Sequence, residues 1–401
     1  MKPTWRWFGD TDPISINAVS QTGAKGVVSA LHHLDPGVVW SGPEIAAHQE
    51  KICNTPSGEA TGLSWDVVES LPVSEEIKQR KGNFEDHILA YKDSLTHLAA
   101  AGIRTVCYNF MPVIDWTRTD TEHRQPNGAT CMRFDYVDFA VFDVFLLRRE
   151  NAKADFPAEV IAEAQLRYGS LSQEGQTRLI HTIIAGLPGS AKGYHLDEFR
   201  KAIDAYKDIT PDGLRNNLRA FLAEIVPHAE QSGIRMAIHP DDPPFPLLGL
   251  PRIVSTLGDY KAIGQMHDSP ANGFTLCSGS LGARGDNDLV DMFKQLKDRI
   301  YFLHLRNVAR ESETVPTSFH EAEHLAGAVA MDDLVCEIVE EEIARSHASG
   351  TPFEFIFRPD HGWRLISDFS QNTLPGYPCI GRLKGMAEIM GLEQGLRHAM
   401  V

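Results

Sequence analysis

The sequence lacks the features of a disulfide-stabilised, secreted or membrane-spanning protein. Its six cysteines are scattered along 401 residues and include no Cys-x-x-Cys pair, so neither a disulfide framework nor a structural zinc motif is expected. No stretch approaches the roughly 18 to 20 apolar residues that a membrane-spanning helix needs. The first residues contain no apolar run of the kind found in a secretion signal. We therefore expect a cytoplasmic protein.

Basic residues are scarce relative to acidic ones. The chain has 38 Lys and Arg against 54 Asp and Glu, which gives a formal net charge of −16. Such a protein repels nucleic-acid phosphates and anionic membrane surfaces, so neither is an expected partner. An anionic small molecule would need local positive charge. The hydrophobic content of 42% is that of a globular protein with a large core.

Eight short apolar runs alternate with amphipathic, helix-like segments. We expect strands at residues 5–8, 26–31, 64–69, 103–110, 235–238, 274–277, 300–305 and 353–357. Strands joined by helices of this length pair in parallel, because a parallel connection needs a crossover of a dozen or more residues. Eight such units close a (β/α)8 TIM barrel, so the predicted fold class is α/β.

The alternation breaks down between about residues 111 and 210. This stretch is polar, has helix-like pieces at 158–167 and 196–206, and contains a Pro-Gly turn at 187–189. We interpret 111–210 as a mainly helical insertion after the fourth strand of a single barrel domain that spans 1–401. The sequence leaves open whether this insertion covers the rim of the barrel or forms a contact in a homo-oligomer.

Side chains that can bind a metal follow the last four predicted strands. His239 follows the fifth strand, Cys277 ends the sixth, His304 lies in the seventh, and Asp360 follows the eighth. In a parallel barrel these strand ends meet on one rim, where the active sites of this fold lie. Two imidazoles, a thiolate and a carboxylate from adjacent strands would suit one divalent metal ion.

Each of these residues also has a purely structural interpretation. A lone cysteine on a strand is most often a small buried hydrophobe. His304 could be a hydrogen-bonded core histidine, and Asp360 could cap a loop or helix. Ligand-type side chains at four successive strand ends fit packing needs poorly, and this coincidence favours the metal site.

Further polar residues are expected on the same rim. Asn109, Asp115 and Arg118 follow the fourth strand, and Arg306 and Arg358 lie at the ends of the seventh and eighth. We expect them to contact a polar substrate, and the arginines to offset the acidic background for an anionic ligand. The alternative for each is a salt bridge outside the substrate pocket.

Several segments resemble the mannonate dehydratase family. They lie at residues 4–7, 30–33, 67–70, 104–113, 115–120, 239–244, 249–255 and 358–362. The resemblance runs from the first strand to about residue 385, without a departure at the positions that matter. It implies dehydration of D-mannonate to 2-dehydro-3-deoxy-D-gluconate in hexuronate and glucuronate catabolism, on a barrel related to xylose isomerase. It also implies a Mn²⁺ cofactor, with Fe²⁺ or another divalent metal as an alternative, and a small sugar acid as the substrate.

The resemblance also assigns residues. The metal ligands of the family fall on the four strand-end residues named above, and its proton-transfer residues fall on His361 and Tyr377. An imidazole, with an ordinary pKa of about 6.5, exchanges protons near neutral pH, whereas a tyrosine starts at about 10 and needs activation to act as a base. Which residue is the acid and which the base stays open, as does a role for Tyr377 in orienting the substrate only.

Two other functions compete with this interpretation. A metal-dependent aldose-ketose isomerase on the same barrel would act on a neutral sugar, and a sugar-binding protein would keep the barrel without the chemistry. The metal itself is a separate question, because a thiolate with two imidazoles binds zinc more tightly than manganese. A purified sample could therefore carry the wrong ion.

Overall fold

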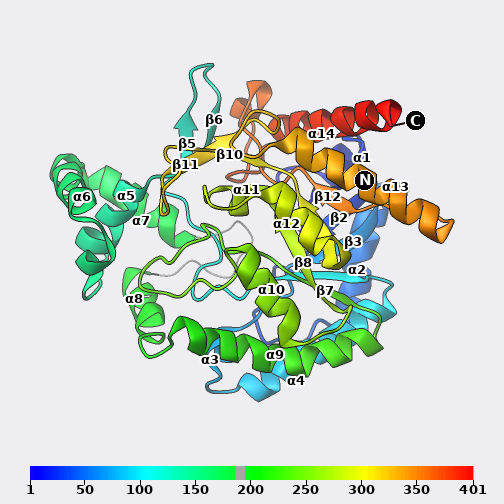
Figure 1. Cartoon of the computed structure of the whole chain (residues 1–401), viewed down its shortest axis with the longest axis horizontal. Helices are drawn as coiled ribbons and strands as arrows, with labels where there is room; N and C mark the ends of the chain where they lie inside the picture. The colour runs from blue at the N-terminus through cyan, green and yellow to red at the C-terminus, as the bar shows by residue number, and fades with distance from the viewer. Residues whose placement is uncertain (186–194, 401) are drawn as a thin grey trace.

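The computed structural model, which describes residues 1–185 and 195–400, is built around a closed barrel of parallel strands (Figure 1). Its eight strands, in order around the barrel, are β1 (Lys2–Arg6), β12 (Ile356–Arg358), β9 (Ile300–His304), β8 (Asn272–Cys277), β7 (Arg235–Ile238), β4 (Thr105–Tyr108), β3 (Ser64–Glu69) and β2 (Gly26–Ser29). The predicted TIM barrel is confirmed. The observed strand ends differ from the predicted ones by a few residues, most at the first and last strands.

The barrel strands are buried on both faces, which explains why they appear in the sequence as continuous apolar runs. One small cluster contains Val28, Val67, Cys107 and Phe302, each from a different strand. Neighbouring residues of the same strands join the main hydrophobic core instead. This division follows the alternation of side chains between the barrel interior and the surrounding helices.

Helices surround the barrel in chain order. They are α1 (Ile16–Ser20), α2 (Gly42–Cys53), α3 (Glu75–Gln79), α4 (Phe84–Ala100), α9 (Pro211–Gln231), α10 (Leu257–Met266), α11 (Ser278–Gly282), α12 (Leu289–Leu296), α13 (Met331–Ser349) and α14 (Cys379–Ala399), with short η1 (Gly9–Thr11), η4 (Lys297–Arg299) and η5 (Ile366–Ser370) turns. Local chemistry sets their ends. Thr210 caps α9 ahead of Pro211, and Gly350 ends α13 in the left-handed conformation with φ of 68°.

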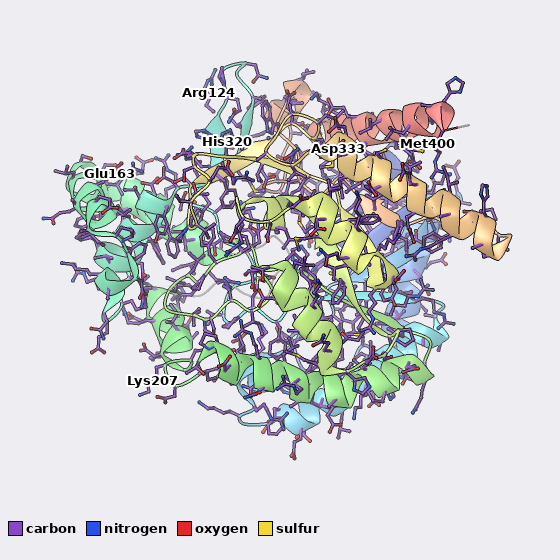
Figure 2. The ribbon with its side chains drawn as sticks, in the orientation of Figure 1. Arg124, Glu163, Lys207, His320, Asp333 and Met400 are labelled. Atoms are coloured by element: carbon purple, nitrogen blue, oxygen red, sulfur yellow. The ribbon has the colours of Figure 1, made fainter. Side chains whose placement is uncertain are left out.

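The insertion between β4 and β7 is mainly helical, as predicted. It contains α5 (Tyr136–Ala140), the π-helical η2 (Val141–Leu146), η3 (Ala152–Asp155), α6 (Ala158–Ser170), α7 (Gln173–Ala185) and α8 (Leu196–Asp204). Figure 2 labels Glu163 on α6, at the outer end of this segment. The turn predicted at 187–189 lies outside the described residues.

A second, antiparallel sheet was not predicted. It has the order β10-β11-β6-β5, and we call it the side sheet. Its strands β5 (Asp120–Arg124) and β6 (Thr130–Phe134) come from the insertion, whereas β10 (Asn307–Arg310) and β11 (Phe319–Ala322) follow the barrel strand β9. Phe319 pairs with Phe134 where the two hairpins meet. Two excursions from the barrel therefore join in one sheet, on which Figure 2 labels Arg124 and His320.

Within the described part of the chain, no helix combines the length and the apolar character that crossing a membrane requires.

Candidate active site and metal centre

Three of the predicted metal ligands meet at the carboxyl ends of adjacent barrel strands. His239 directly follows β7, and Cys277 and His304 are the last residues of β8 and β9, where they pair in register. Their ligand atoms all lie within 4.8 Å of one another, and His239 Nε2 is 3.2 Å from His304 Nδ1. This His/Cys/His set, in which Cys277 and His304 are buried and His239 is half-buried, could hold a metal ion.

Asp360, the fourth predicted ligand, lies beside this set. Its Oδ2 is 3.7 Å from Cys277 Sγ and 3.7 Å from His304 Nδ1. The same carboxylate forms ion pairs with Arg306, at 2.6 Å, and with Arg358. Burial opposes its ionisation, but the Arg358 guanidinium and the other nearby cations hold the pKa of Asp360 well below its ordinary value.

A small cavity of about 40 Å³ lies beside this set, with His239 and Asp360 in its lining and Cys277 and His304 outside it. The cavity is lined by Glu69, Ser70, Asn109, Met111, Asp115, Trp116, His239, Asp242, Arg306, Arg358, Asp360, His361 and Tyr377. The structure thus brings both predicted proton-transfer residues and four of the five predicted substrate residues to one cavity. Arg118 is the exception, because it does not line the cavity and is fully buried.

Buried carboxylates neutralise the arginines around the cavity. Arg306 forms ion pairs with Asp242 at 2.6 Å and with Glu321 at 2.9 Å, in addition to Asp360. Arg358 forms an ion pair with Glu69 at 2.8 Å in addition to Asp360. Neither predicted anion-binding arginine therefore has its positive charge free for a ligand.

Arg118 belongs to the same ion-pair network. Its guanidinium lies 2.7 Å from Asp242 and 3.3 Å from Glu321. The arginines outweigh the effect of burial on the carboxylates, so the pKa of Asp242 lies below its ordinary value and the pKa of Glu321 is lowered to about 2. Arg118 thus supports the wall of the cavity from behind.

Sequence reasoning gave no role to Glu69, Asp242 or Glu321. For two of these residues the sequence did contain a signal. Asp242 belongs to the His-Pro-Asp-Asp-Pro-Pro segment after the fifth barrel strand, and Glu69 is the last residue of the third. Glu321 had no such signal, because it lies on the unpredicted strand β11.

His361 and Tyr377 lie next to each other in the cavity wall. Their rings meet edge to face with centroids 5.1 Å apart, and Trp116 approaches His361 from another side at 6.4 Å. Nδ1 of His361 lies 3.0 Å from Glu321 Oε1. Burial raises the pKa of Tyr377 to about 12, against the opposing effect of Arg358, so its phenol stays protonated at neutral pH.

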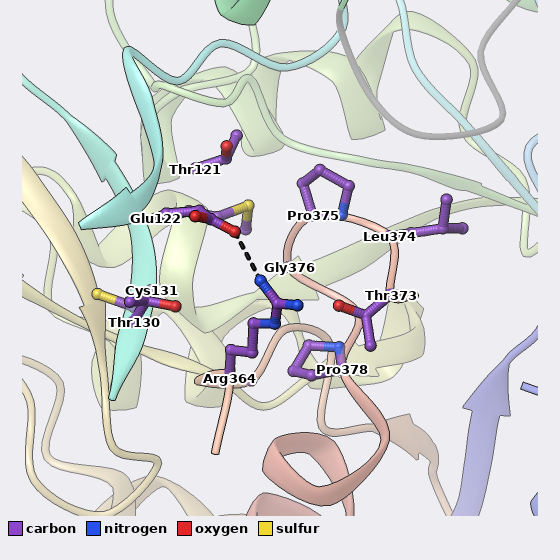
Figure 3. A pocket seen from close by; sticks show the side chains of 12 residues that line it. Thr121, Glu122, Thr130, Cys131, Arg364, Thr373, Leu374, Pro375, Gly376 and Pro378 are labelled. Carbon is purple, nitrogen blue, oxygen red and sulfur yellow. Dashed lines mark hydrogen bonds and ion pairs between the residues drawn. The ribbon is translucent and has the colours of Figure 1, made fainter. Parts of the chain in front are cut away.

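A second cavity adjoins the segment that carries Tyr377 (Figure 3). Its lining includes Gly362 and Gly376, the chain neighbours of His361 and Tyr377, and the backbone N–H of Gly362 donates to the carbonyl of Gly376 at 3.1 Å. An ion pair of 2.7 Å between Arg364 and Glu122 crosses it. None of the predicted site residues lines this cavity.

Comparison with known proteins gives matches along the full length of the chain. Residues 1–401 match the family model described as D-mannonate dehydratase (UxuA). The chain is 49% identical over 399 residues to Mannonate dehydratase 1 of Agrobacterium fabrum, which covers 99% of this chain and 98% of the relative. It is also 49% identical over 401 residues to the mannonate dehydratase of Chromohalobacter salexigens, with 100% of both chains covered.

A solved structure shows the same overall fold. The crystal structure of mannonate dehydratase from Streptococcus suis serotype 2 matches with a TM-score of 0.76 at 31% sequence identity. The match covers 100% of this chain and 94% of the other.

Proposed function

The chain belongs to the D-mannonate dehydratase (UxuA) family, and on this basis we propose that it is a hydro-lyase that converts D-mannonate to 2-dehydro-3-deoxy-D-gluconate and water. The observation that carries the proposal is the similarity along the whole chain to named mannonate dehydratases. The cavity at the barrel rim, which brings His361 and Tyr377 beside the His239, Cys277 and His304 cluster, supports it independently. Cytoplasmic location and assembly into homo-oligomers stay predictions from the sequence.

We propose His239, Cys277, His304 and Asp360 as the ligands of one divalent cation. The donor set fits such an ion, because two imidazoles and a thiolate lie within 4.8 Å of one another and a carboxylate adjoins them. Mn²⁺ follows from the resemblance, whereas the soft thiolate favours Zn²⁺ or Fe²⁺ over Mn²⁺ in raw affinity. A bound cation would add the positive charge that the neutralised arginines lack, and would stabilise negative charge on the substrate carboxylate.

We propose different roles for the two proton-transfer residues. Nδ1 of His361 is engaged by Glu321, which leaves Nε2 to accept the C2 proton of the substrate. Tyr377, whose pKa is raised to about 12, is suited to donate a proton to the departing C3 hydroxyl rather than to act as a base. The geometry thus favours His361 as the base and Tyr377 as the acid.

The other lining residues would orient the sugar acid. Asn109 and Asp115 offer hydrogen-bonding groups to its hydroxyls, and Arg306 and Arg358 fix the positions of the carboxylates around the cation. Arg118 would act on the substrate only through Asp242 and Glu321.

The test is incubation of the purified protein with D-mannonate and Mn²⁺, followed by detection of a 2-keto-3-deoxy acid. Product formation that stops on chelation and returns with added metal is the expected result. Turnover of a neutral aldose alone would identify an isomerase instead. Binding of mannonate that a chelator does not affect, without turnover, would identify a sugar-binding protein.

A further inference from the structure

We propose that Glu321 is a positioning residue for the dehydration, which holds the His361 imidazole in one orientation and one tautomer so that Nε2 faces the substrate. The proposal rests on the proposed role of His361 as the base. Glu321 does not line the cavity and so acts through the imidazole rather than by touching the substrate.

The contact between the two side chains defines the tautomer. Glu321 Oε1 lies 3.0 Å from His361 Nδ1, and both side chains are buried. A carboxylate paired with two arginines is ionised and can only accept hydrogen bonds, so Nδ1 must be the donor. In the neutral ring, the lone pair is then on Nε2, the nitrogen that lies 3.5 Å from Asp360 Oδ1.

The carboxylate of Glu321 is itself fixed in place. Its Oε1 also accepts hydrogen bonds from Arg306 Nη1 at 2.9 Å and from Arg118 Nη2 at 3.3 Å. The indole N–H of Trp363 donates to the backbone carbonyl of Glu321 at 2.8 Å, and Glu321 pairs with Val308 between strands β11 and β10. Three donors on one oxygen, together with a held backbone, leave this group little freedom to rotate.

Glu321 lies on the side sheet and not on a barrel strand. The barrel rim supplies the metal ligands, whereas the sheet built from the two excursions supplies the partner of the base. Tyr377 and Trp116 flank the ring of His361 and further restrict its rotation. The side sheet therefore has a defined task in the reaction, which is to orient the imidazole.

A double-mutant cycle tests this inference. In otherwise unchanged, Mn²⁺-loaded enzyme, we expect Glu321→Gln to lower kcat by about 10²- to 10⁴-fold, with KM within about threefold and metal content unchanged. In the His361→Ala background, the same substitution should lower the residual rate less than twofold, because its effect passes through the imidazole. An equal loss in both backgrounds, or an unchanged kcat in the single variant, would overturn the proposal.

Two further variants distinguish an effect on catalysis from a folding defect. Glu321→Asp keeps the buried negative charge but shortens the side chain, which lengthens the contact to Nδ1 as well as those to the arginines. It should therefore lose kcat to an intermediate degree, and it replaces Glu321→Gln in the cycle if that variant does not fold. Glu323→Gln is the matched control just beyond β11. Its carboxylate pairs with Lys384 at 2.6 Å, away from the cavity, and its kcat should be unchanged.

The tautomer of His361 can also be determined by spectroscopy, without measuring turnover. In ¹⁵N-histidine spectra of Zn²⁺-loaded protein, the signal that His361→Ala removes should be that of an Nδ1–H tautomer, and it should shift in Glu321→Gln. An Nε2–H tautomer at His361 would contradict the inference. If the wild-type protein does not turn over mannonate, the proposed function fails, and this spectrum still decides the arrangement of Glu321.

Discussion

Cys277 and His304 end neighbouring strands and face each other across the proposed metal centre. Replacing either by a residue with a weaker or absent ligand atom, as in Cys277→Ser and His304→Ala, should therefore release the metal. His361→Ala removes a proposed base but no proposed ligand, so it should keep the metal and lose turnover. Metal-to-protein ratios after dialysis check both parts. Full metal occupancy in Cys277→Ser would exclude this cysteine as a needed ligand.

Because of His48 on α2, we expect the folded protein to lose stability in mild acid. Ser29 Oγ donates to the carbonyl of Trp7 at 2.6 Å, so the contact of 2.8 Å to His48 Nε2 must be donated by the imidazole. Burial, reinforced by Lys51, lowers the pKa of His48 to about 4. The unfolded chain, with an ordinary histidine pKa near 6.5, thus binds a proton first, and stability present above pH 6.5 is lost as the pH falls toward 4.

The measurement compares the free energy of unfolding of wild type and His48→Gln. The glutamine amide can still donate to Ser29 but does not titrate, so the advantage of the wild type at pH 7 should shrink by about 2 kcal/mol at pH 5. A difference that stays constant between these pH values would show that His48 titrates normally in the folded protein.

Individual site residues could be predicted where residue type and strand position coincide. His239, Cys277, His304 and Asp360 could be found because a parallel barrel places its strand ends on one rim. The pairing of Arg306 and Arg358 with buried acids could not be predicted, because it depends on which side chains face one another across the barrel. For the same reason the sequence could not show that Arg118 points away from the cavity.

At the scale of helices and strands, α14 makes a backbone-to-backbone contact with the segment that follows His361. A Cβ at Gly381 would overlap the carbonyl oxygen of Trp363. Gly381→Ala should therefore push this segment away, with a loss of about 1 to 3 kcal/mol in stability and a clear loss of activity. Thermal unfolding and steady-state kinetics together measure the effect.

Gly391 in the same helix provides the control. It is exposed, and a Cβ there would meet no heavy atom within 4 Å. Gly391→Ala should leave activity unchanged and stabilise the protein by up to about 1 kcal/mol, as alanine favours helix over glycine. Similar effects of the two substitutions would show that the close contact at Gly381 does not decide the outcome.

The barrel strands could be predicted because burial on both faces makes them apolar throughout. The side sheet could not be predicted from the sequence. Strand β5 has the sequence Asp-Thr-Glu-His-Arg, without apolar alternation, and β6 pairs with β11 from a distant part of the chain. Pairing of this kind is decided by where the barrel brings two loops together, and no local pattern encodes it.

At the scale of the whole molecule, a metal that binds only the folded chain should stabilise it by mass action. At a free concentration one hundred times its dissociation constant, the gain is about 2.7 kcal/mol. We expect Tm to rise by a few degrees when Mn²⁺ is added to chelator-treated protein, and Cys277→Ser to show no such rise. Equal Tm values with and without metal, in protein shown to bind it, would contradict the proposed centre.

The joining of two excursions in the side sheet has an evolutionary corollary. Neither hairpin can be trimmed alone without exposing the hydrogen-bonding edge of the other, which invites aggregation. The two loops should thus have grown, and should be lost, as a pair. A barrel that lost both hairpins would keep its metal-binding side chains, but His361 would lose the Glu321 carboxylate that orients it. Such a lineage would be free to acquire a different reaction.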